Sequence, residues 1–202
     1  MGRVHLVGDI MLETLRMFLP TIQRRQRWVE LGLERGSYGL ATIHRPSNVD
    51  DPQHLSEVLD ILGMLRLPIV FPAHPRTAKH LEKFGLMERV CAMTHLHMLP
   101  PESYLEFLSL LEGAKLLFSD SGSVQAEASF LNVPCLVCRE NTERPIYVEE
   151  GTSVLVGRDK ERIAEIVSVI GENRFRASSE TVARLGMDVS RKITEILNDF
   201  LV

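Results

Sequence analysis

Short apolar runs alternate with segments of helical periodicity along most of this chain, and this alternation limits the fold more than any other feature. Strand-like runs are expected at residues 4–7, 38–43, 69–71, 115–118, 135–137 and 153–156. Helices are expected from residue 11 and at residues 21–33, 53–65, 77–84, 102–112, 124–131, 161–170 and 191–201. Short strands separated by helices favour a parallel sheet with helices on both faces. The predicted fold class is therefore α/β, with a Rossmann-like sheet.

Length and charge narrow the classes of protein that this chain can represent. A chain of 202 residues is long enough for one sizeable core, which predicts one domain. Its formal net charge of -4 gives no electrostatic signal for nucleic acid or an anionic membrane, and no apolar run approaches membrane-spanning length. Three cysteines, an odd number, and the lack of a signal-peptide pattern indicate a reducing compartment. We therefore expect a cytoplasmic protein that binds neither nucleic acid nor membrane.

Cysteine and histidine pairs in the chain do not predict a metal site. Cys135 and Cys138 lie in and next to a strand-like run, where residues three apart point to opposite faces. Zinc and redox sites usually place such a pair at a turn or helix start. His95 and His97 would share a face of an extended segment, but no second ligand pair of suitable spacing accompanies them. The prediction is that the chain binds no metal.

Several polar side chains follow the strand-like runs directly. His44, His74, Ser121 and Arg144 all do so, and ligands of parallel sheets bind at the carboxyl ends of the strands. The pattern alone therefore predicts that these residues converge. An imidazole such as that of His44 can transfer a proton or bind a phosphate oxygen. The alternative is a loop histidine that contacts only the backbone.

A strand-to-helix turn around Ser121, Gly122 and Ser123 has the features of a phosphate site. Small residues let the backbone approach a ligand, and the N–H groups at a helix start attract anions. Glu127 lies about one helical turn further on, within reach of a ribose attached to that phosphate. Arg144 could add a charge-assisted contact. The alternative is a capped helix after a buried strand, in which Glu127 is an acid favoured by the helix dipole.

Four loop motifs occur in a fixed order along the chain. They are His-Arg-x-x-Asn at 44–48, Pro-x-His at 72–74, Ser-Asp-Ser-Gly-x-x-Gln-x-Glu at 119–127 and Thr-Glu-Arg-Pro at 142–145. With this set the chain resembles, over about residues 3–170, the C-terminal half of the non-hydrolysing UDP-N-acetylglucosamine 2-epimerases. Each motif is weak alone, whereas the ordered set is specific. Pro46, Ser47 and Ser123 depart from the residues common in that family.

The resemblance implies an activity and a domain organisation. UDP-N-acetylglucosamine and UDP-N-acetylmannosamine would be interconverted by elimination of UDP and its re-addition, with no cofactor. Residues 1–202 would form the C-terminal UDP-binding domain of a two-domain protein with the glycosyltransferase-B-type architecture. The first domain, which carries most catalytic carboxylates in the family, would lie outside this chain. We therefore expect the isolated chain to be inactive, and the full-length parent to form a homodimer.

The resemblance also implies roles for individual side chains. Catalytic roles fall on His44, Glu143 and Arg144. Contacts with UDP fall on residues that follow strand ends or lie on two of the predicted helices: His44, Phe107, Ser121, Gly122, Ser123, Glu127 and Arg144. Phe107 would pack near uracil, although its helical spacing fits a core position equally well.

Two further residues are candidates for regulation. His74 matches a histidine of a second, activating UDP-N-acetylglucosamine site in bacterial members, and the alternative is a loop histidine packed by Pro72 and Pro75. Arg45 is either a ligand contact or an ion-pair partner. Asn48, in the same loop as Arg45, is expected to cap the turn before Asp50.

Three other functions remain open at the level of sequence. A hydrolysing relative would release UDP and free N-acetylmannosamine. A nucleotide-sugar glycosyltransferase domain would also place a glutamate on a helix beside a nucleoside diphosphate. A non-enzymatic domain that senses UDP-sugars, or has a purely structural role, is the third, because a fold does not by itself fix a function.

Overall fold

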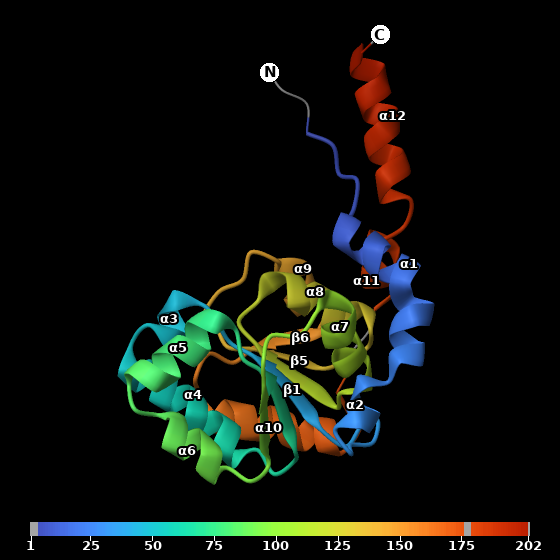
Figure 1. Cartoon of the computed structure of the whole chain (residues 1–202). Coiled ribbons are helices and arrows are strands. Elements are labelled where there is room, and N and C mark those ends of the chain that lie inside the picture. Colours follow the sequence, from blue (N-terminus) through green and yellow to red (C-terminus); the bar gives the residue numbers. More distant parts are fainter. Residues whose placement is uncertain (1–3, 176–178, 202) are drawn as a thin grey trace.

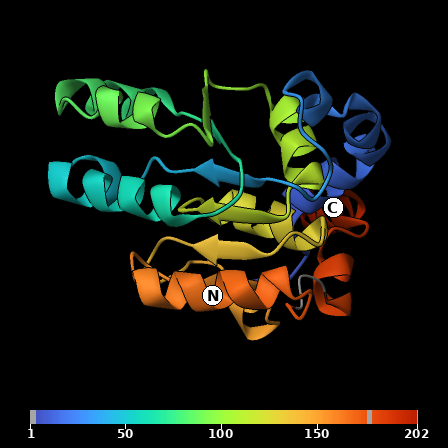
Figure 2. The ribbon, with the colours of Figure 1, turned by 90° about the horizontal axis from the view of Figure 1, so that it is seen from below.

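A single parallel sheet forms the centre of the molecule (Figures 1 and 2). The computed structural model describes residues 4–175 and 179–201. Within them, six strands lie in the order β3-β2-β1-β4-β5-β6, and every neighbouring pair is parallel. Their bounds are β1 (Gly39–Thr42), β2 (Ile69–Pro72), β3 (Leu96–Leu99), β4 (Leu116–Ser119), β5 (Cys135–Val137) and β6 (Ser153–Leu155). The predicted α/β, Rossmann-like class is confirmed.

Helices cover both faces of this sheet. Strand side chains alternate between the faces, so Leu40 and Leu117 belong to one apolar core whereas Ala41 and Phe118 belong to the other. One face packs against α4 (Pro52–Met64), α5 (Pro75–Lys83), α6 (Met87–Ala92) and α10 (Lys160–Gly171). The other packs against α1 (Ile10–Arg25), α2 (Arg27–Glu30), α7 (Tyr104–Gly113) and α8 (Gly122–Phe130).

Local sequence explains where the long helices begin. The Asp51 side chain accepts hydrogen bonds from the backbone N–H groups of Gln53 and His54, and Pro52 occupies the first position of α4. A proline fits there because that N–H has no partner within the helix. Six of the expected helices lie within two residues of their predicted ends: α4, α5, α7, α8, α10 and α12 (Val189–Leu201). The pattern did not predict the short helices α3 (Pro46–Val49), α6, α9 (Pro145–Glu149) and α11 (Glu180–Leu185).

Three expectations about the elements were wrong. Residues 4–7 are not a strand, and Val4 and Leu6 are 98% and 96% exposed beside the protruding helix α12 (Figure 1). Their β-forming side chains have no neighbouring strand to pair with. The helix expected at 21–33 is broken at Gln26, whose φ of 42° is left-handed. Strand β3 was missed because its polar residue His97 and partial burial hide it at the edge of the sheet.

None of the helices in the described part of the chain combines the length and the apolar character needed to span a bilayer.

Gly113 gives the packing of α7 a testable limit. A Cβ atom at this glycine would lie 2.8 Å from Cδ2 of the Trp28 indole, a rigid ring that is only 5% exposed. We expect Gly113→Ala to lower the free energy of unfolding by about 1–3 kcal/mol, because the core there is already filled. Urea unfolding followed by circular dichroism measures this change.

Gly171 provides the matched control for that substitution. It also lies in a helix, α10, and no described atom lies within 4 Å of a Cβ placed there. Gly171→Ala should raise the free energy of unfolding by about 0.5–1 kcal/mol through helix propensity alone. Equal effects of the two substitutions would show that Trp28 does not limit the space at Gly113.

Candidate functional site

The predicted site lies where the direction of the strand order reverses. The chain passes from β1 to β2 and β3 on one side, and β4 then pairs with β1 on the other side. Such a switch point leaves a crevice at the carboxyl ends of the strands. His44 follows β1, and residues 120–123 follow β4, so the loops of the first and third sequence motifs meet here. The expected convergence of His44 and Ser121 is confirmed.

The Asp120 carboxylate connects these two loops. It is fully buried and accepts hydrogen bonds from the backbone N–H groups of His44 at 3.1 Å and Arg45 at 2.8 Å. The Asn48 amide adds a third hydrogen bond, at 2.9 Å, and also donates to the carbonyl of Cys138. The Asn48 side chain was expected to cap the turn before Asp50. Instead, it connects its own loop to the loops after β4 and β5. Asp120 was not among the predicted site residues, although its place between Ser119 and Ser121 in the third motif was a usable signal.

His44 and His74 form a stacked pair beside Asp120. Their ring centroids are 5.2 Å apart, and Nδ1 of His44 lies 3.2 Å from Oδ1 of Asp120. Burial lowers the pKa of His44, and the negative charge of Asp120 raises it in part. The nearby His74, Arg45 and Arg76 lower the pKa further. The ring therefore favours its neutral form near pH 7, in which one nitrogen can accept a proton. The expected convergence of His44 and His74 is confirmed.

His74 has a structural role that the sequence did not predict. Its Nδ1 accepts a hydrogen bond from the backbone N–H of Arg76, so the side chain caps the start of α5. The ring is exposed apart from its contact with His44. The alternative of a histidine that only packs between Pro72 and Pro75 is therefore incomplete.

The start of α8 carries a cluster of opposite charges. Gly122 lets the Glu143 carboxylate come so close that a Cβ at this glycine would lie 3.0 Å from Cδ of Glu143. Arg45 donates to this carboxylate at 2.8 Å, and Arg139 pairs with it from the other side. Two guanidinium groups and the positive end of the helix dipole thus surround one position for an anion. The Glu143 side chain fills that position, and its ion-pair partners are Arg45 and Arg139, whereas Arg144 pairs with Asp9.

Glu127 and Arg144 lie in a separate group further along α8. Glu127 is 2% exposed, and its Oε1 has no hydrogen-bond partner among the described residues. Burial raises the pKa of Glu127 to about 7, with a contribution from Asp9, while the Tyr104 hydroxyl and Arg144 oppose the rise. Arg144 forms an ion pair with Asp9. The structure therefore places Arg144 on the same side as Glu127, and Glu143 at the helix start.

Gln125 explains how the Thr-Glu-Arg-Pro loop keeps its place. Its Oε1 accepts a hydrogen bond from the Thr142 hydroxyl at 2.9 Å. The Thr142 hydroxyl oxygen in turn accepts a hydrogen bond from the backbone N–H of Arg144 at 3.0 Å. Gln125 is fully buried, so the loop is anchored to the interior of α8. This chain of contacts fixes where both Glu143 and Arg144 point.

Three other predicted features have clear positions. Phe107 is half-buried and packs against the core that α7 covers, so both of its proposed roles stay open. The hydroxyls of Ser121 and Ser123 lie 3.1 Å apart at the start of α8. Cys135 and Cys138 belong to opposite cores, as predicted, and burial raises the pKa of each thiol to about 12. Neither cysteine is a nucleophile near neutral pH.

Comparison with known proteins gives a consistent result over nearly the whole chain. The sequence profile of the UDP-N-acetylglucosamine 2-epimerase family matches residues 1–198. A UDP-N-acetylglucosamine 2-epimerase homolog of Methanococcus maripaludis is 39% identical over 96% of this chain and 54% of its own length. The UDP-2,3-diacetamido-2,3-dideoxy-D-glucuronate 2-epimerase of Pseudomonas aeruginosa is 36% identical over 79% of this chain and 43% of its own length.

A solved structure agrees with these sequence matches. The UDP-GlcNAc 2-epimerase of Methanocaldococcus jannaschii, in complex with UDP-GlcNAc and UDP, superposes with a TM-score of 0.79 at 31% identity. The match covers 95% of this chain and 54% of that one. This chain thus spans about half the length of the relatives that it matches.

The buried carboxylate of Glu127 predicts a pH dependence of stability. Its pKa is raised from an ordinary 4.5 to about 7 in the folded chain, so the folded state favours the protonated form. The associated stabilisation is present below the unfolded pKa and is lost as the pH rises through the folded pKa. Glu127→Gln removes this titration. The free energy of unfolding of the variant relative to the wild type should therefore rise by up to about 3 kcal/mol between about pH 4.5 and pH 8.

Urea unfolding of both proteins across this pH range measures the difference. Glu149→Gln, at the exposed end of α9, is the control and should show little change with pH. A constant difference between Glu127→Gln and the wild type would show that Glu127 is ionised normally.

Proposed function

This chain belongs to the UDP-N-acetylglucosamine 2-epimerase family, and from this premise we propose that it is the UDP-binding half of an enzyme that interconverts UDP-N-acetylglucosamine and UDP-N-acetylmannosamine. The observation that carries the proposal is the pairing of two features on α8. An anion position lies at the start of the helix, and the unpartnered carboxylate oxygen of Glu127 lies further along it. A nucleoside diphosphate offers a diphosphate for the first feature and ribose hydroxyls for the second.

The diphosphate would take the position that the Glu143 carboxylate holds. Arg45 and Arg139 contact that carboxylate, and a diphosphate there would accept the same guanidinium hydrogen bonds. Gly122 leaves room for the phosphate oxygens to reach the backbone N–H groups of α8, and Ser121 and Ser123 add hydroxyl donors. Glu143 must then turn away, because two anions cannot share one position.

The ribose would lie against Glu127. A carboxylate can accept hydrogen bonds from two hydroxyl groups, whereas placing it against a phosphate would repel that group. The Arg144–Asp9 pair borders the same region, which supports a contact between Arg144 and the nucleotide. Phe107 on α7 would provide an apolar surface for uracil.

His44 would act on the sugar as an acid or base. In the proposed reaction a proton leaves C2 and the C1–oxygen bond to UDP breaks, which gives 2-acetamidoglucal and UDP. Re-addition of UDP to C1, with a proton delivered to the opposite face of C2, gives the epimer. Holding UDP next to the glycal makes re-addition effectively unimolecular. His44 is the neutral imidazole at this site. Arg144 would balance the negative charge of the leaving UDP, and Glu143, once turned away from the diphosphate, would act near the sugar.

The remaining catalytic groups would come from a first domain. This chain covers only about half of its relatives, and we propose that it is the second domain of a two-domain enzyme. Three free cysteines, two of them buried, support a reducing and therefore cytoplasmic location.

The first test asks whether the chain binds the nucleotide without turning over the sugar. We expect titration calorimetry to detect UDP binding to the 202-residue chain, and NMR to detect no N-acetylmannosamine epimer after incubation with UDP-N-acetylglucosamine. The reason is that the UDP site lies within one domain whereas the chemistry needs groups from another. Failure to bind UDP would contradict the proposed site, and turnover would contradict the need for a first domain.

The second test asks what Glu127 recognises. At pH 8, above its pKa of about 7, Glu127 is mostly ionised. Glu127→Gln keeps the shape of the side chain but removes this charge, so UDP should bind more weakly by roughly 1.5–3 kcal/mol per lost charged hydrogen bond. Binding of inorganic pyrophosphate should stay the same or improve, because a nearby negative charge has been removed. Calorimetry with both ligands decides the point. Equal loss for UDP and pyrophosphate would show that Glu127 supports the loop and does not contact the ribose, and Glu149→Gln is the control.

A further inference from the structure

We infer that Asp120, held in place by Asn48 and Arg158, fixes the His44 imidazole with its proton on Nδ1, so that Nε2 is the nitrogen that faces a substrate. Asp120, Asn48 and Arg158 are then positioning residues for His44. The inference rests on the proposed function only in giving Nε2 a substrate to act on. The tautomer itself can be measured on the chain alone.

The contacts of Asp120 define it as an acceptor toward His44. Its two carboxylate oxygens accept from the backbone N–H groups of His44 and Arg45 and from the Asn48 amide. The side chain is completely buried, so no solvent competes for these oxygens. Nδ1 of His44 lies 3.2 Å from Oδ1 of Asp120, within ion-pair distance. An ionised carboxylate has no proton to donate and attracts an N–H group, so this contact favours the tautomer with its proton on Nδ1.

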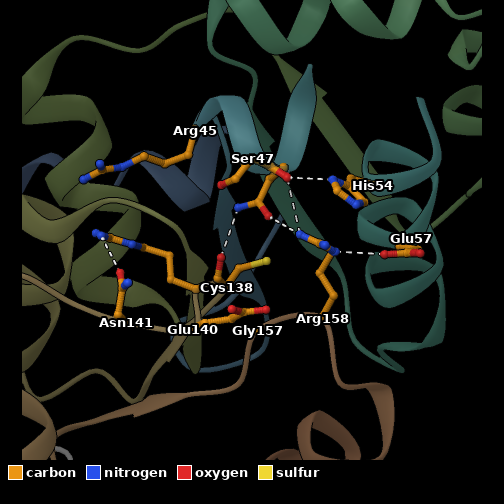
Figure 3. Close-up of a pocket in the computed structure, with 11 residues that line it drawn as sticks. Arg45, Ser47, His54, Glu57, Cys138, Glu140, Asn141, Gly157 and Arg158 are labelled. Atoms are coloured by element: carbon orange, nitrogen blue, oxygen red, sulfur yellow. Dashed lines mark hydrogen bonds and ion pairs between the residues drawn. The ribbon is translucent and has the colours of Figure 1, made fainter. Parts of the chain in front are cut away.

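Arg158 completes the hydrogen bonds that orient the Asn48 amide. Nη1 of Arg158 lies 2.9 Å from Oδ1 of Asn48, and a guanidinium only donates hydrogen bonds. The amide oxygen of Asn48 must therefore point to Arg158, and its NH2 group to Asp120 and the Cys138 carbonyl. Glu57 on α4 holds Arg158 in turn, with Nε and Oε2 2.8 Å apart. Glu57, Arg158 and the Asn48 amide thus form a row of side chains. Figure 3 shows Glu57 and Arg158 side by side, with a dashed line for the ion pair between them.

The row crosses one wall of a cavity of about 620 Å³ between the loops after β1, β5 and β6 (Figure 3). The Arg158 side chain enters this wall from the loop before α10. Helix α10 packs on the opposite face of the sheet from α8. The hydrogen bonds of Arg158 go to Glu57, Asn48 and the Ser47 carbonyl, so Arg158 holds neither Glu143, whose place the diphosphate would take, nor Glu127. The contacts that connect Arg158 to His44 run through Asn48 and Asp120.

The other charged neighbours of His44 are compatible with a neutral ring. Arg45 from its own loop, and His74 and Arg76 from the loop after β2, disfavour a second proton on the imidazole. Asp120 acts in the opposite direction and selects the position of the first proton. The result is a ring whose Nε2 lone pair is free to accept a proton from a substrate.

The test uses the full chain labelled with nitrogen-15 in its histidines. Long-range proton–nitrogen correlation spectra, recorded as the pH is raised until His44 is neutral, distinguish a protonated from an unprotonated ring nitrogen. We expect Nδ1 of His44 to be protonated and Nε2 to be unprotonated. His54, whose Nδ1 lies 2.9 Å from the Ser47 carbonyl, gives an internal reference for a protonated Nδ1. A proton on Nε2 of His44 would overturn the inference.

Two variants test the supporting row. Arg158→Ala removes the donor to the Asn48 amide oxygen, so the Asn48 side chain is held only through its NH2 group and Asp120 is placed less firmly. We therefore expect a mixture of His44 tautomers and a shifted His44 titration midpoint. Arg162→Ala is the matched control, because Arg162 follows closely on the same helix but donates to the Leu155 carbonyl. Its His44 spectrum should equal that of the wild type. Unchanged His44 signals in Arg158→Ala, or equal changes in both variants, would overturn the role of Arg158.

Asp120→Asn tests the central contact directly. A carboxamide can present either its oxygen or its NH2 group to Nδ1, so the single tautomer should be lost in a variant whose other amide signals remain native. If this variant does not fold, the Arg158→Ala result decides. UDP titration of Arg158→Ala separates this inference from the proposed function, because binding should stay within about twofold of wild type. Absence of UDP binding in every protein would count against the proposed function, while the tautomer result would stand.

Discussion

The Asp120 carboxylate, buried at the carboxyl end of β4, accepts hydrogen bonds from the backbone of the His44 loop and from the Asn48 amide. Burying a charge is costly unless several donors compensate it, and here N–H groups from two parts of one loop do so. The loops after β1 and β4 are thereby held at a fixed separation. The position of His44 and the start of α8 both depend on this contact.

Charge is distributed around that carboxylate in two separate groups. Arg45 and Arg139 gather at the start of α8, where the Glu143 side chain supplies the balancing anion. Glu127 lies further along the helix in a buried position that favours its neutral form. A ligand with a diphosphate and a sugar hydroxyl pair would replace the first interaction and complete the second. For the proposed nucleoside diphosphate, the donors are thus already in place and the Glu143 carboxylate is the group that would have to move.

Local pattern predicted the elements that bury apolar side chains on a regular period. The helix α4, with its cap at Asp51, and the strand β4 both have strong periodic signals and lie where they were expected. The pattern failed where neighbours decide the outcome. Residues 4–7 have strand-forming side chains but no strand beside them, and β3 forms at the sheet edge because β2 offers it a backbone partner.

By itself the sequence determined the α/β class, the convergence of His44 and Ser121 at the strand ends, and the family, because alternating periodicity and ordered loop motifs are local properties of the chain. Only the tertiary structure decided the partners of those residues. Asp120 and His44 are brought together because β4 pairs with β1, which no local pattern specifies. Arg158 and Asn48 lie 110 residues apart in sequence and meet only because the sheet places the loops after β1 and β6 around one cavity. Strand order is set by the packing of the whole core, so contacts that depend on it cannot be predicted from local residue patterns.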